Sequence, residues 1–410
     1  MTETRREDGL RVLGGLSAAA FLGDYWQRRP LLVRQAFPGF EPPLDGGDLA
    51  GLALEDTVES RLVRGSASQP WRVRHGPFAE GDFLQAPERD WTLLVQDVDK
   101  HVPDAAWITD AFDFLPQWQL DDLMVSYAVP GGSVGPHVDR YDVFLLQGHG
   151  VRRWQIGPPG SGRETLSGGL RLLDGFEATD TWDLEPGDLL YLPPGVPHHG
   201  VAVTACTTWS IGLRSVSALD LLTGLVDDLG RDEQALAPIP DTIPTGRRPP
   251  ARLTDRDLAH WRAALRQLLA DDRQLDRAIA RTLSGNKPGF LETDDEAEDL
   301  QILPSAATPS DPDVDRLPSA GLLVRHPAVR LTLLPATADD AARLCINGEE
   351  QRLPLHRFAL ADCLCGKRQV PVAALDGHLT SADNRRWLQQ LLDRGLWEHQ
   401  SDQGGGNCQR

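Results

Sequence analysis

The chain has 410 residues, a formal charge of −19 at pH 7 and a hydrophobic fraction of 40%. This length exceeds that of one average core and predicts two or three domains. No apolar run approaches the roughly 18 residues that a membrane span needs, and the opening MTETRREDGL precedes no apolar stretch ending in a cleavage site. We therefore expect no membrane helix and no signal peptide.

Charge and cysteine content restrict the partners and the compartment. A uniformly acidic protein is repelled by the phosphates of nucleic acids, so direct nucleic-acid binding is not expected, whereas a basic protein would be attracted. The alternative is that the negative charge only keeps the protein soluble and indicates nothing about its partners. The five cysteines are scattered, which favours free thiols in a reducing, cytoplasmic setting over disulfides or a zinc site; they are Cys206, Cys345, Cys363, Cys365 and Cys408.

The sequence pattern changes along the first half of the chain. Residues 17–25 predict a helix, and LLVRQAF after them predicts a strand. WTLLVQDVD at 91–99 predicts a second strand. Apolar residues at helical spacing then predict a helix over 105–115. From 122 to 206, short apolar runs separated by Gly and Pro recur about every 8–12 residues, which is typical of a sandwich or barrel of antiparallel strands.

A second block begins after the proline-rich passage 238–250. Thr254 fits an N-cap, and the apolar stripe after it predicts a helical region that continues to about residue 283. Such a stripe is usually core, although a helix appended to a barrel is also a common dimerisation surface. The acidic run at 292–299 indicates a solvated face, and the stretch 303–317, rich in Pro, Ser and Ala, indicates a linker.

The last block, about 318–400, has the pattern of a small α+β module. Asn347-Gly348 between two strand-like runs is a hairpin signal. Residues 381–395 predict a terminal helix that begins at a capping serine and stops at Gly395. Nothing catalytic stands out in this block.

The passage GGSVGPHVDRYDVFLLQGHGVRRW carries a pair of metal-ligand residue types. His137 and Asp139 are two apart, and alternate residues of a strand share a face, so both side chains can aim at one point inside a barrel. Imidazole and carboxylate suit Fe(II), and one more histidine would complete a facial triad. Asp142 lies three residues on and faces away, so we expect it to be structural, and His149 does not repeat the spacing either.

The third ligand is predicted in EPGDLLYLPPGVPHHG, where two turns flank a buried strand and deliver His198 or His199. A lone H-x-D occurs by chance in many chains, but H-x-D followed at this separation by PGD, a strand and P-x-G-x-x-H is specific. The alternative is a chance group of surface histidines. The spacing alone leaves His198 and His199 open.

Three protein ligands leave three octahedral positions, which a bidentate 2-oxo acid and O2 require. Arg152 can offer a bidentate guanidinium to the distal carboxylate of 2-oxoglutarate. Its neighbour Arg153 must point to the opposite face, and alternation does not say which of the two points inward. Ser126 and Thr208 are candidate hydroxyl donors to the cosubstrate, although a hydroxyl satisfied within its own strand is the more frequent case.

At these residues the sequence resembles the JmjC-type ribosomal oxygenases of the cupin superfamily. The matching stretches are YWQRRPLLVRQAF, WTLLVQDVD, GPHVDRYDVFLLQGHGVRRW and GDLLYLPPGVPHHG, within residues 20–215. The resemblance implies a mainly β fold, a double-stranded β-helix barrel with flanking helices over 1–218. A helical dimerisation region over 219–302 and a winged-helix-like α+β module over 303–410 would follow.

The resemblance also implies roles for single residues. The family's metal motif falls on His137, Asp139 and His198, which resolves the choice that spacing left open. Its cosubstrate anchor in G-x-[KR]-x-W falls on Arg152, and Trp154 closes that motif.

Ser126 matches a hydroxyl residue that lines the same pocket in the family. Two positions depart from the family pattern, since His199 stands where an acidic residue is frequent and Thr208 where Asn is frequent. Either departure could adjust cosubstrate contacts or substrate fit without removing the metal site.

The function that the resemblance implies is hydroxylation of an arginine side chain of a large-subunit ribosomal protein, with Fe(II), 2-oxoglutarate and O2, by a homodimer. A ribosomal histidine is an alternative target. A cupin enzyme that uses a metal without 2-oxoglutarate is a second alternative, and it would make Arg152 an ordinary surface residue. A binding protein whose C-terminal module recruits nucleic acid or a ribosomal partner is a third, although that module shows no basic stripe.

Overall fold

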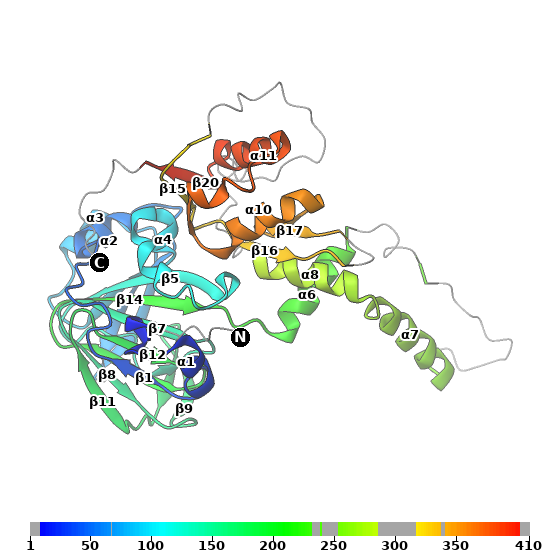
Figure 1. Ribbon diagram of the computed structural model, residues 1–410. Helices are drawn as coiled ribbons and strands as arrows, with labels where there is room; N and C mark the ends of the chain where they lie inside the picture. The colour runs from blue at the N-terminus through cyan, green and yellow to red at the C-terminus, as the bar shows by residue number, and fades with distance from the viewer. Residues whose placement is uncertain are drawn as a thin grey trace. The chain divides into compact units, whose positions relative to one another are not determined.

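The computed structural model describes residues 9–66, 68–231, 238–239, 253–285, 317–337 and 341–401. The chain forms two compact units, divided between Ser215 and Val216 (Figure 1). The predicted acidic run at 292–299, the linker at 303–317 except its last residue, most of the proline-rich passage and Cys408 lie outside the described residues. No helix in these ranges is long and apolar enough to cross a membrane.

The N-terminal unit is built on two antiparallel sheets and a hairpin. The eight-stranded sheet has, in spatial order, β1 (Leu31–Val33), β12 (Leu189–Leu192), β7 (Val143–His149), β14 (Cys206–Leu213), β5 (Leu120–Ala128), β4 (Trp91–Val95), β2 (Ser60–Ser66) and β3 (Gln69–His75). The four-stranded sheet has β11 (Asp180–Leu184), β8 (Arg152–Ile156), β13 (Pro197–Ala202) and β6 (His137–Val138). The hairpin consists of β9 (Arg163–Ser167) and β10 (Leu170–Asp174). This is the mainly β architecture of antiparallel strands that the sequence predicted.

Side-chain alternation along β7 separates the barrel interior from an outer core. Val143 and Leu145 join a buried cluster with Trp154 and Ile156 of the smaller sheet. The intervening Phe144 belongs instead to the cluster on the opposite face, beneath the flanking helices. Because successive strand residues point to opposite faces, one apolar strand contributes to both cores.

The flanking helices are short: α1 (Ala18–Asp24), α2 (Gly46–Leu52), α3 (Glu80–Leu84), α4 (Val98–His101) and α5 (Trp107–Asp110). The helix over 17–25 is confirmed, and Ser17 caps it. The continuous helix expected over 105–115 is wrong, because the α-helix stops at Asp110 and the chain continues in turns. Phe112 and Leu115 are nevertheless buried, so the pattern indicated burial correctly without the helix.

The strand expected over 91–99 ends early. β4 stops at Val95, and Asp97 adopts a left-handed backbone conformation (φ 53°) from which α4 begins. The apolar run was therefore a strand followed by a helical turn.

The C-terminal unit contains the helices α6 (Ala218–Leu229), α7 (Asp255–Leu268), α8 (Asp272–Ser284), α10 (Leu355–Gly366) and α11 (Ala382–Asp393). Its three-stranded sheets are β19 (Gln369–Pro371), β15 (Leu322–Arg325) and β20 (Trp397–Gln400), and β16 (Leu331–Leu334), β17 (Arg343–Ile346) and β18 (Glu349–Arg352). Thr254 caps α7 as predicted. The helical region is two helices, however, because Asp271 caps a new start at α8.

The two other local predictions for this unit are confirmed. Asn347-Gly348 connects β17 to β18, and both residues have positive φ. Ser381 caps α11, and Gly395 has the left-handed conformation (φ 65°) just beyond its end. A separate core of buried residues that includes Trp387 and Trp397 holds the unit together.

A β-bulge in β7 lies next to the barrel interior. Thr207 of β14 pairs with His149 while Thr208 pairs with Gln147, so Gly148 is the extra residue. A Cβ at Gly148 would lie 2.5 Å from Thr207 Oγ1 and 2.6 Å from Trp209 Nε1. Thr207 cannot move freely, because its Oγ1 accepts a hydrogen bond from the His149 backbone N–H. Only glycine fits here.

We expect Gly148→Ala to lower the free energy of unfolding by about 1–3 kcal/mol, since it overpacks the bulge. The matched control is Gly51→Ala in α2, where a Cβ would meet nothing within 4 Å; it should stabilise by about 0.5–1 kcal/mol through helix propensity. Urea denaturation followed by tryptophan fluorescence measures both. Equal stability of the Gly148→Ala and wild-type proteins would contradict the packing argument.

Candidate metal centre and cosubstrate pocket

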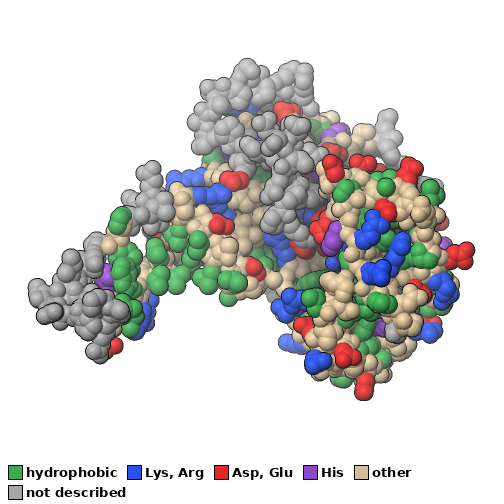
Figure 2. Space-filling view, turned by 180° about the vertical axis from the view of Figure 1, so that it is seen from behind, with side chains coloured by type: hydrophobic (Ala, Val, Ile, Leu, Met, Phe, Trp, Pro, Cys, Tyr) green, Lys and Arg blue, Asp and Glu red, His purple; other side chains and the backbone are tan. Residues whose placement is uncertain are grey.

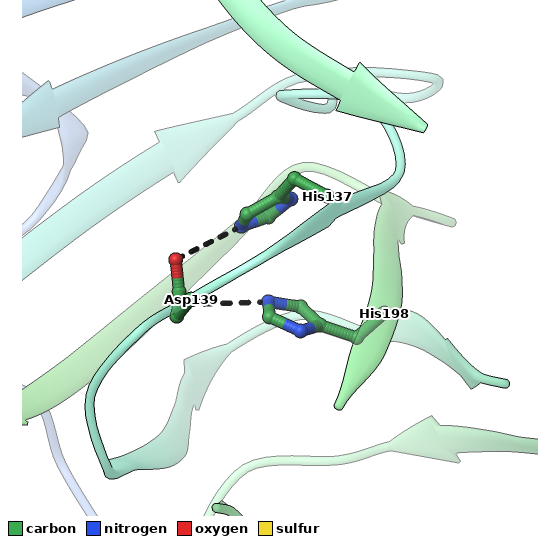
Figure 3. A group of neighbouring side chains, drawn as sticks. All are labelled: His137, Asp139 and His198. Atoms are coloured by element: carbon green, nitrogen blue, oxygen red, sulfur yellow. Dashed lines mark ion pairs between the residues drawn. The ribbon is translucent and has the colours of Figure 1, made fainter. Parts of the chain in front are cut away.

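The structure brings His137, Asp139 and His198 together inside the barrel (Figure 3). One potential ligand atom from each lies within 4.8 Å of the others, and no other such group occurs in the described part of the chain. His137 and His198 are direct cross-strand partners of β6 and β13. Asp139 follows β6 immediately and is not itself in a strand. The short strand β6 and the residues after it therefore direct the side chains of His137 and Asp139 toward one point.

The ring nitrogens of both histidines have distinct roles. Nδ1 of His137 lies 2.9 Å from the Gly135 carbonyl oxygen, and Nδ1 of His198 lies 2.9 Å from that of Val196. A carbonyl oxygen only accepts, so each Nδ1 carries a hydrogen, and in the neutral ring each Nε2 therefore has the lone pair. The two Nε2 atoms face Asp139, at 3.6 Å from Oδ1 for His137 and 3.5 Å from Oδ2 for His198. This orientation is typical of metal-ligating histidines.

The electrostatics of the triad favour the metal-binding form of His137 and Asp139. Burial and the neighbouring His198 lower the pKa of His137 to about 4, so its ring is neutral at pH 7. Burial acts to raise the pKa of Asp139, but the adjacent imidazoles of His198 and His137 hold it below its ordinary value. A neutral His137 imidazole and an ionised Asp139 carboxylate bind a divalent cation without first losing protons.

The neighbouring candidates lie elsewhere. His199 is outside the triad and packs against the Phe176 ring, with 6.3 Å between ring centroids. Burial and the charge of Arg152 lower the pKa of His199 to about 4. Asp142 is buried and accepts hydrogen bonds from Tyr191 Oη (2.5 Å) and Gln27 Nε2 (3.1 Å), which confirms the structural role predicted for it. His149 is exposed.

Arg152 points into the barrel and Arg153 points out. Arg152 is 3% exposed, whereas Arg153 forms an exposed bidentate pair with Asp183 of the adjacent strand. Arg152 Nη1 donates to Ser126 Oγ at 3.1 Å and to Thr208 Oγ1 at 3.2 Å. The two hydroxyl residues predicted from the sequence therefore both contact the predicted cation.

Arg152 has no carboxylate partner among the residues that the structure describes. Its Nε is buried without a hydrogen-bond partner in this part of the chain, and burial lowers the pKa of its guanidinium. A buried cation without a counter-ion is costly. The position therefore suits a ligand that brings a carboxylate.

Trp154 connects the two parts of the site. Its ring lies 5.4 Å from Arg152 Cζ and 5.8 Å, between centroids, from the His198 ring. Gly200 faces it on β13, where a Cβ would lie only 2.7 Å from the indole. The missing side chain at Gly200 makes room for the indole between the triad and the guanidinium.

Two residues of this region, Gln147 and Tyr141, were not predicted from the sequence. Gln147 is fully buried on β7, and its Oε1 accepts from Thr208 Oγ1 at 3.3 Å. Gln147 could have been predicted from its spacing, because it follows Val143 and Leu145 at intervals of two residues and so points inward with them. Tyr141, two residues after Asp139, is 40% exposed.

Tyr141 interacts electrostatically with the carboxylate of the metal centre. Burial of its hydroxyl raises its pKa, the negative charges of Asp139 and Asp122 raise it further, and the positive charge of Arg61 acts to lower it. Charges of both signs therefore surround this aromatic residue.

Known proteins match this chain over most of its length. A sequence model of the JmjC domain matches residues 108–221, and one of the ROXA-like winged helix matches 267–398. The ribosomal protein uL16 3-hydroxylase of Escherichia coli K12 is 34% identical over 381 residues, which are 92% of this chain and 96% of that protein. A probable ribosomal oxygenase of Haemophilus influenzae is 34% identical over 286 residues, 67% of this chain and 70% of that protein.

A solved structure extends the similarity to three dimensions. The E. coli ribosomal oxygenase YcfD, in complex with cobalt and 2-oxoglutarate, matches with a TM-score of 0.73 and 33% identity, over 92% of this chain and 96% of that one. The fold, the length of the match and the buried His–Asp–His group lead to one conclusion: the chain belongs to the JmjC-domain ribosomal oxygenases, a family of 2-oxoglutarate-dependent protein hydroxylases.

Proposed function

We propose that this chain hydroxylates an arginine side chain of a large-subunit ribosomal protein, with Fe(II) as its metal and 2-oxoglutarate and O2 as cosubstrates. The observation that carries the proposal is the pairing of the His–Asp–His group with a buried guanidinium, Arg152, that has no carboxylate partner among the described residues. The related E. coli enzyme is named a ribosomal protein uL16 3-hydroxylase.

His137, Asp139 and His198 would hold the iron, and this donor set leaves room for a bidentate 2-oxo acid and O2. When bound, the iron supplies oxidation of a C–H bond coupled to decarboxylation of 2-oxoglutarate. One oxygen atom of O2 enters succinate and the other enters the new hydroxyl, while CO2 leaves.

The chain's own residues bind and orient the metal and the cosubstrate and shield the site from water. The carbonyls of Gly135 and Val196 hold the two histidine rings in place. Arg152 binds the distal carboxylate, with the hydroxyls of Ser126 and Thr208 beside it. The apolar interior that includes Trp154 excludes water from the site.

The part-exposed ring of Tyr141 favours an arginine over a histidine as the target. A guanidinium stacks on an aromatic face, and Tyr141 offers such a face within electrostatic range of Asp139. A neutral imidazole gains less from such stacking. The net charge of −19 also attracts a basic ribosomal protein.

The rival functions fit less well. A metal-dependent cupin enzyme without 2-oxoglutarate would leave Arg152 as an ordinary surface residue, but Arg152 is buried. A purely binding protein would give no reason for three ligand side chains held in their metal-binding form.

We further propose a homodimer in which residues 219–302 form the dimerisation region and 303–410 the winged-helix-like module. Leu219, Leu222 and Val226 of α6 are exposed at helical spacing. None of the described residues of α7 is buried, although Trp261 and Leu265 lie on it. Figure 2 shows hydrophobic side chains gathered over these helices. A second copy of the chain would cover such a face.

We also propose a cytoplasmic location, because a reducing compartment suits unpaired cysteines.

Substitution of the triad should abolish turnover. We expect His137→Ala and Asp139→Ala to stop succinate formation from 2-oxoglutarate and to weaken Mn²⁺ binding, because each removes a ligand. The control is His149→Ala, which changes an exposed histidine of the same sequence stretch and should retain both. Succinate is measured by mass spectrometry and metal binding by calorimetry. Retained succinate formation in Asp139→Ala would contradict the proposed centre.

Neighbouring arginines provide a matched pair for the cosubstrate pocket. Arg152→Ala should raise the Kd for 2-oxoglutarate about 10- to 100-fold, since a hydrogen bond to a charged group is lost. Arg153→Ala removes only an exposed pair with Asp183 and should change that Kd less than about twofold. Titration of the Mn²⁺-loaded protein measures both. An equal effect of the two substitutions would mean that Arg152 is not the anchor.

The target residue is tested by mass spectrometry of the client. Incubation with ribosomal protein uL16, Fe(II), 2-oxoglutarate and O2 should add the mass of one oxygen atom to a peptide, and fragmentation should locate it on an arginine. The Asp139→Ala protein is the negative control. Addition on a histidine instead would overturn the arginine assignment while leaving the oxygenase intact.

A further inference from the structure

We propose that Gln147 is a positioning residue of the cosubstrate pocket. By fixing the direction of the Thr208 hydroxyl, it keeps Thr208 as an acceptor for Arg152 and leaves the Ser126 hydroxyl as the donor to the distal carboxylate of 2-oxoglutarate. This inference rests on the proposed function and adds the hydrogen-bond polarity of the pocket to it.

The three polar residues form one row across the sheet. Gln147 of β7 pairs with Thr208 of β14, and Thr208 pairs with Ser126 of β5. All three side chains are buried, and Gln147 is 0% exposed. Arg152 reaches this row from the opposite sheet through its Nη1 atom.

The Gln147 amide can lie only one way round. Its Nε2 lies 2.9 Å from the carbonyl oxygen of His149 and 3.2 Å from that of Gly150. Carbonyl oxygens only accept, so the atom that faces both must be the NH2 group. The end that faces Thr208, at 3.3 Å, is therefore the oxygen.

This orientation determines the direction of the Thr208 hydroxyl. Gln147 Oε1 can only accept, so the single hydrogen of Thr208 points to it. Arg152 can only donate, so Thr208 Oγ1 receives the hydrogen of Nη1 in its lone pair. Thr208 has no second hydrogen, and it therefore cannot donate to a carboxylate.

The Ser126 hydroxyl differs from the Thr208 hydroxyl in the use of its hydrogen. Its Oγ also accepts from Arg152 Nη1, but no acceptor for its own hydrogen lies within bonding distance in the described residues. That hydrogen is available to a carboxylate bound by Arg152. Two hydroxyls on one guanidinium nitrogen thus have unequal roles, because only one of them is engaged by Gln147.

The consequence is preorganisation of Arg152. With Gln147 in place, the relay from Gln147 through Thr208 to Arg152 is set before the cosubstrate arrives, so less order has to be gained on binding. Loss of the Gln147 oxygen frees the Thr208 hydrogen to turn toward Arg152, where it opposes the guanidinium. We expect a loss of cosubstrate affinity that acts through the distal carboxylate alone.

The experiment compares two ligands on the full chain loaded with Mn²⁺ in the absence of O2. 2-Oxoglutarate has the distal carboxylate, and pyruvate is a 2-oxo acid without it. Calorimetric Kd values are measured for wild type, Gln147→Leu, Thr208→Val, the double variant and Thr208→Ser. Gln147→Met serves as a second variant in case the leucine protein does not fold, and thermal melting reports the integrity of each.

Gln147→Leu and Thr208→Val should each raise the Kd for 2-oxoglutarate about 2- to 10-fold, and the double variant should be no weaker than Thr208→Val. Pyruvate should bind all variants within about twofold of wild type, and Thr208→Ser, which keeps the hydroxyl, should resemble wild type.

Equal weakening of both ligands would overturn the inference, since it would indicate general damage to the pocket. Unchanged or tighter binding of 2-oxoglutarate by Gln147→Leu, or full additivity in the double variant, would overturn it as well. Failure of the wild-type Mn²⁺ protein to bind 2-oxoglutarate at all would instead contradict the proposed function.

Discussion

The position of β13 between β6 and β8 is the constraint on which the site depends. Through β6 it sets His198 opposite His137, and through β8 it sets Gly200 opposite Trp154 and Ala202 opposite Arg152. One strand of six residues thereby aligns the metal centre with the cosubstrate pocket. A slip of one residue in either pairing would turn His198 outward and bring His199 inward.

The eight-stranded sheet forms the other wall of the site. Along its strand β7, the inward-facing residues change from apolar Val143 and Leu145 to polar Gln147. The bulge at Gly148 allows Gln147 to pair with Thr208 while the chain turns back into β8. Strand alternation and one irregularity together place a polar row beside an apolar one, which is how a water-excluding barrel still binds an ionic cosubstrate.

Much of this arrangement could be predicted from the sequence, because strand alternation and turn residues are local. The spacing of His137 and Asp139, the caps of α1, α7 and α11 and the hairpin at Asn347-Gly348 are local features of this kind. The phase of a strand within a sheet is not local. Spacing alone could not choose Arg152 over Arg153 or His198 over His199, because that choice depends on which neighbour each strand pairs with; the family resemblance made it instead.

Gln147 shows a different limit of sequence reasoning. Its importance depends on two carbonyl oxygens, those of His149 and Gly150, which only the fold brings to its amide nitrogen. The helix expected over 105–115 failed for a related reason. Periodicity reports which residues are buried, and turns bury Phe112 and Leu115 as well as a helix does.

The uncompensated guanidinium of Arg152 has a consequence for how ligands load the barrel. With the histidines in the neutral form that binds a metal, the interior carries one negative charge on Asp139 and one positive charge on Arg152. A divalent cation alone leaves the interior doubly positive, and the dianion of a dicarboxylic acid alone leaves it doubly negative. Only both together return it to neutrality. Metal and cosubstrate affinities are therefore thermodynamically linked, each raising the other by the same factor, without any movement of the backbone.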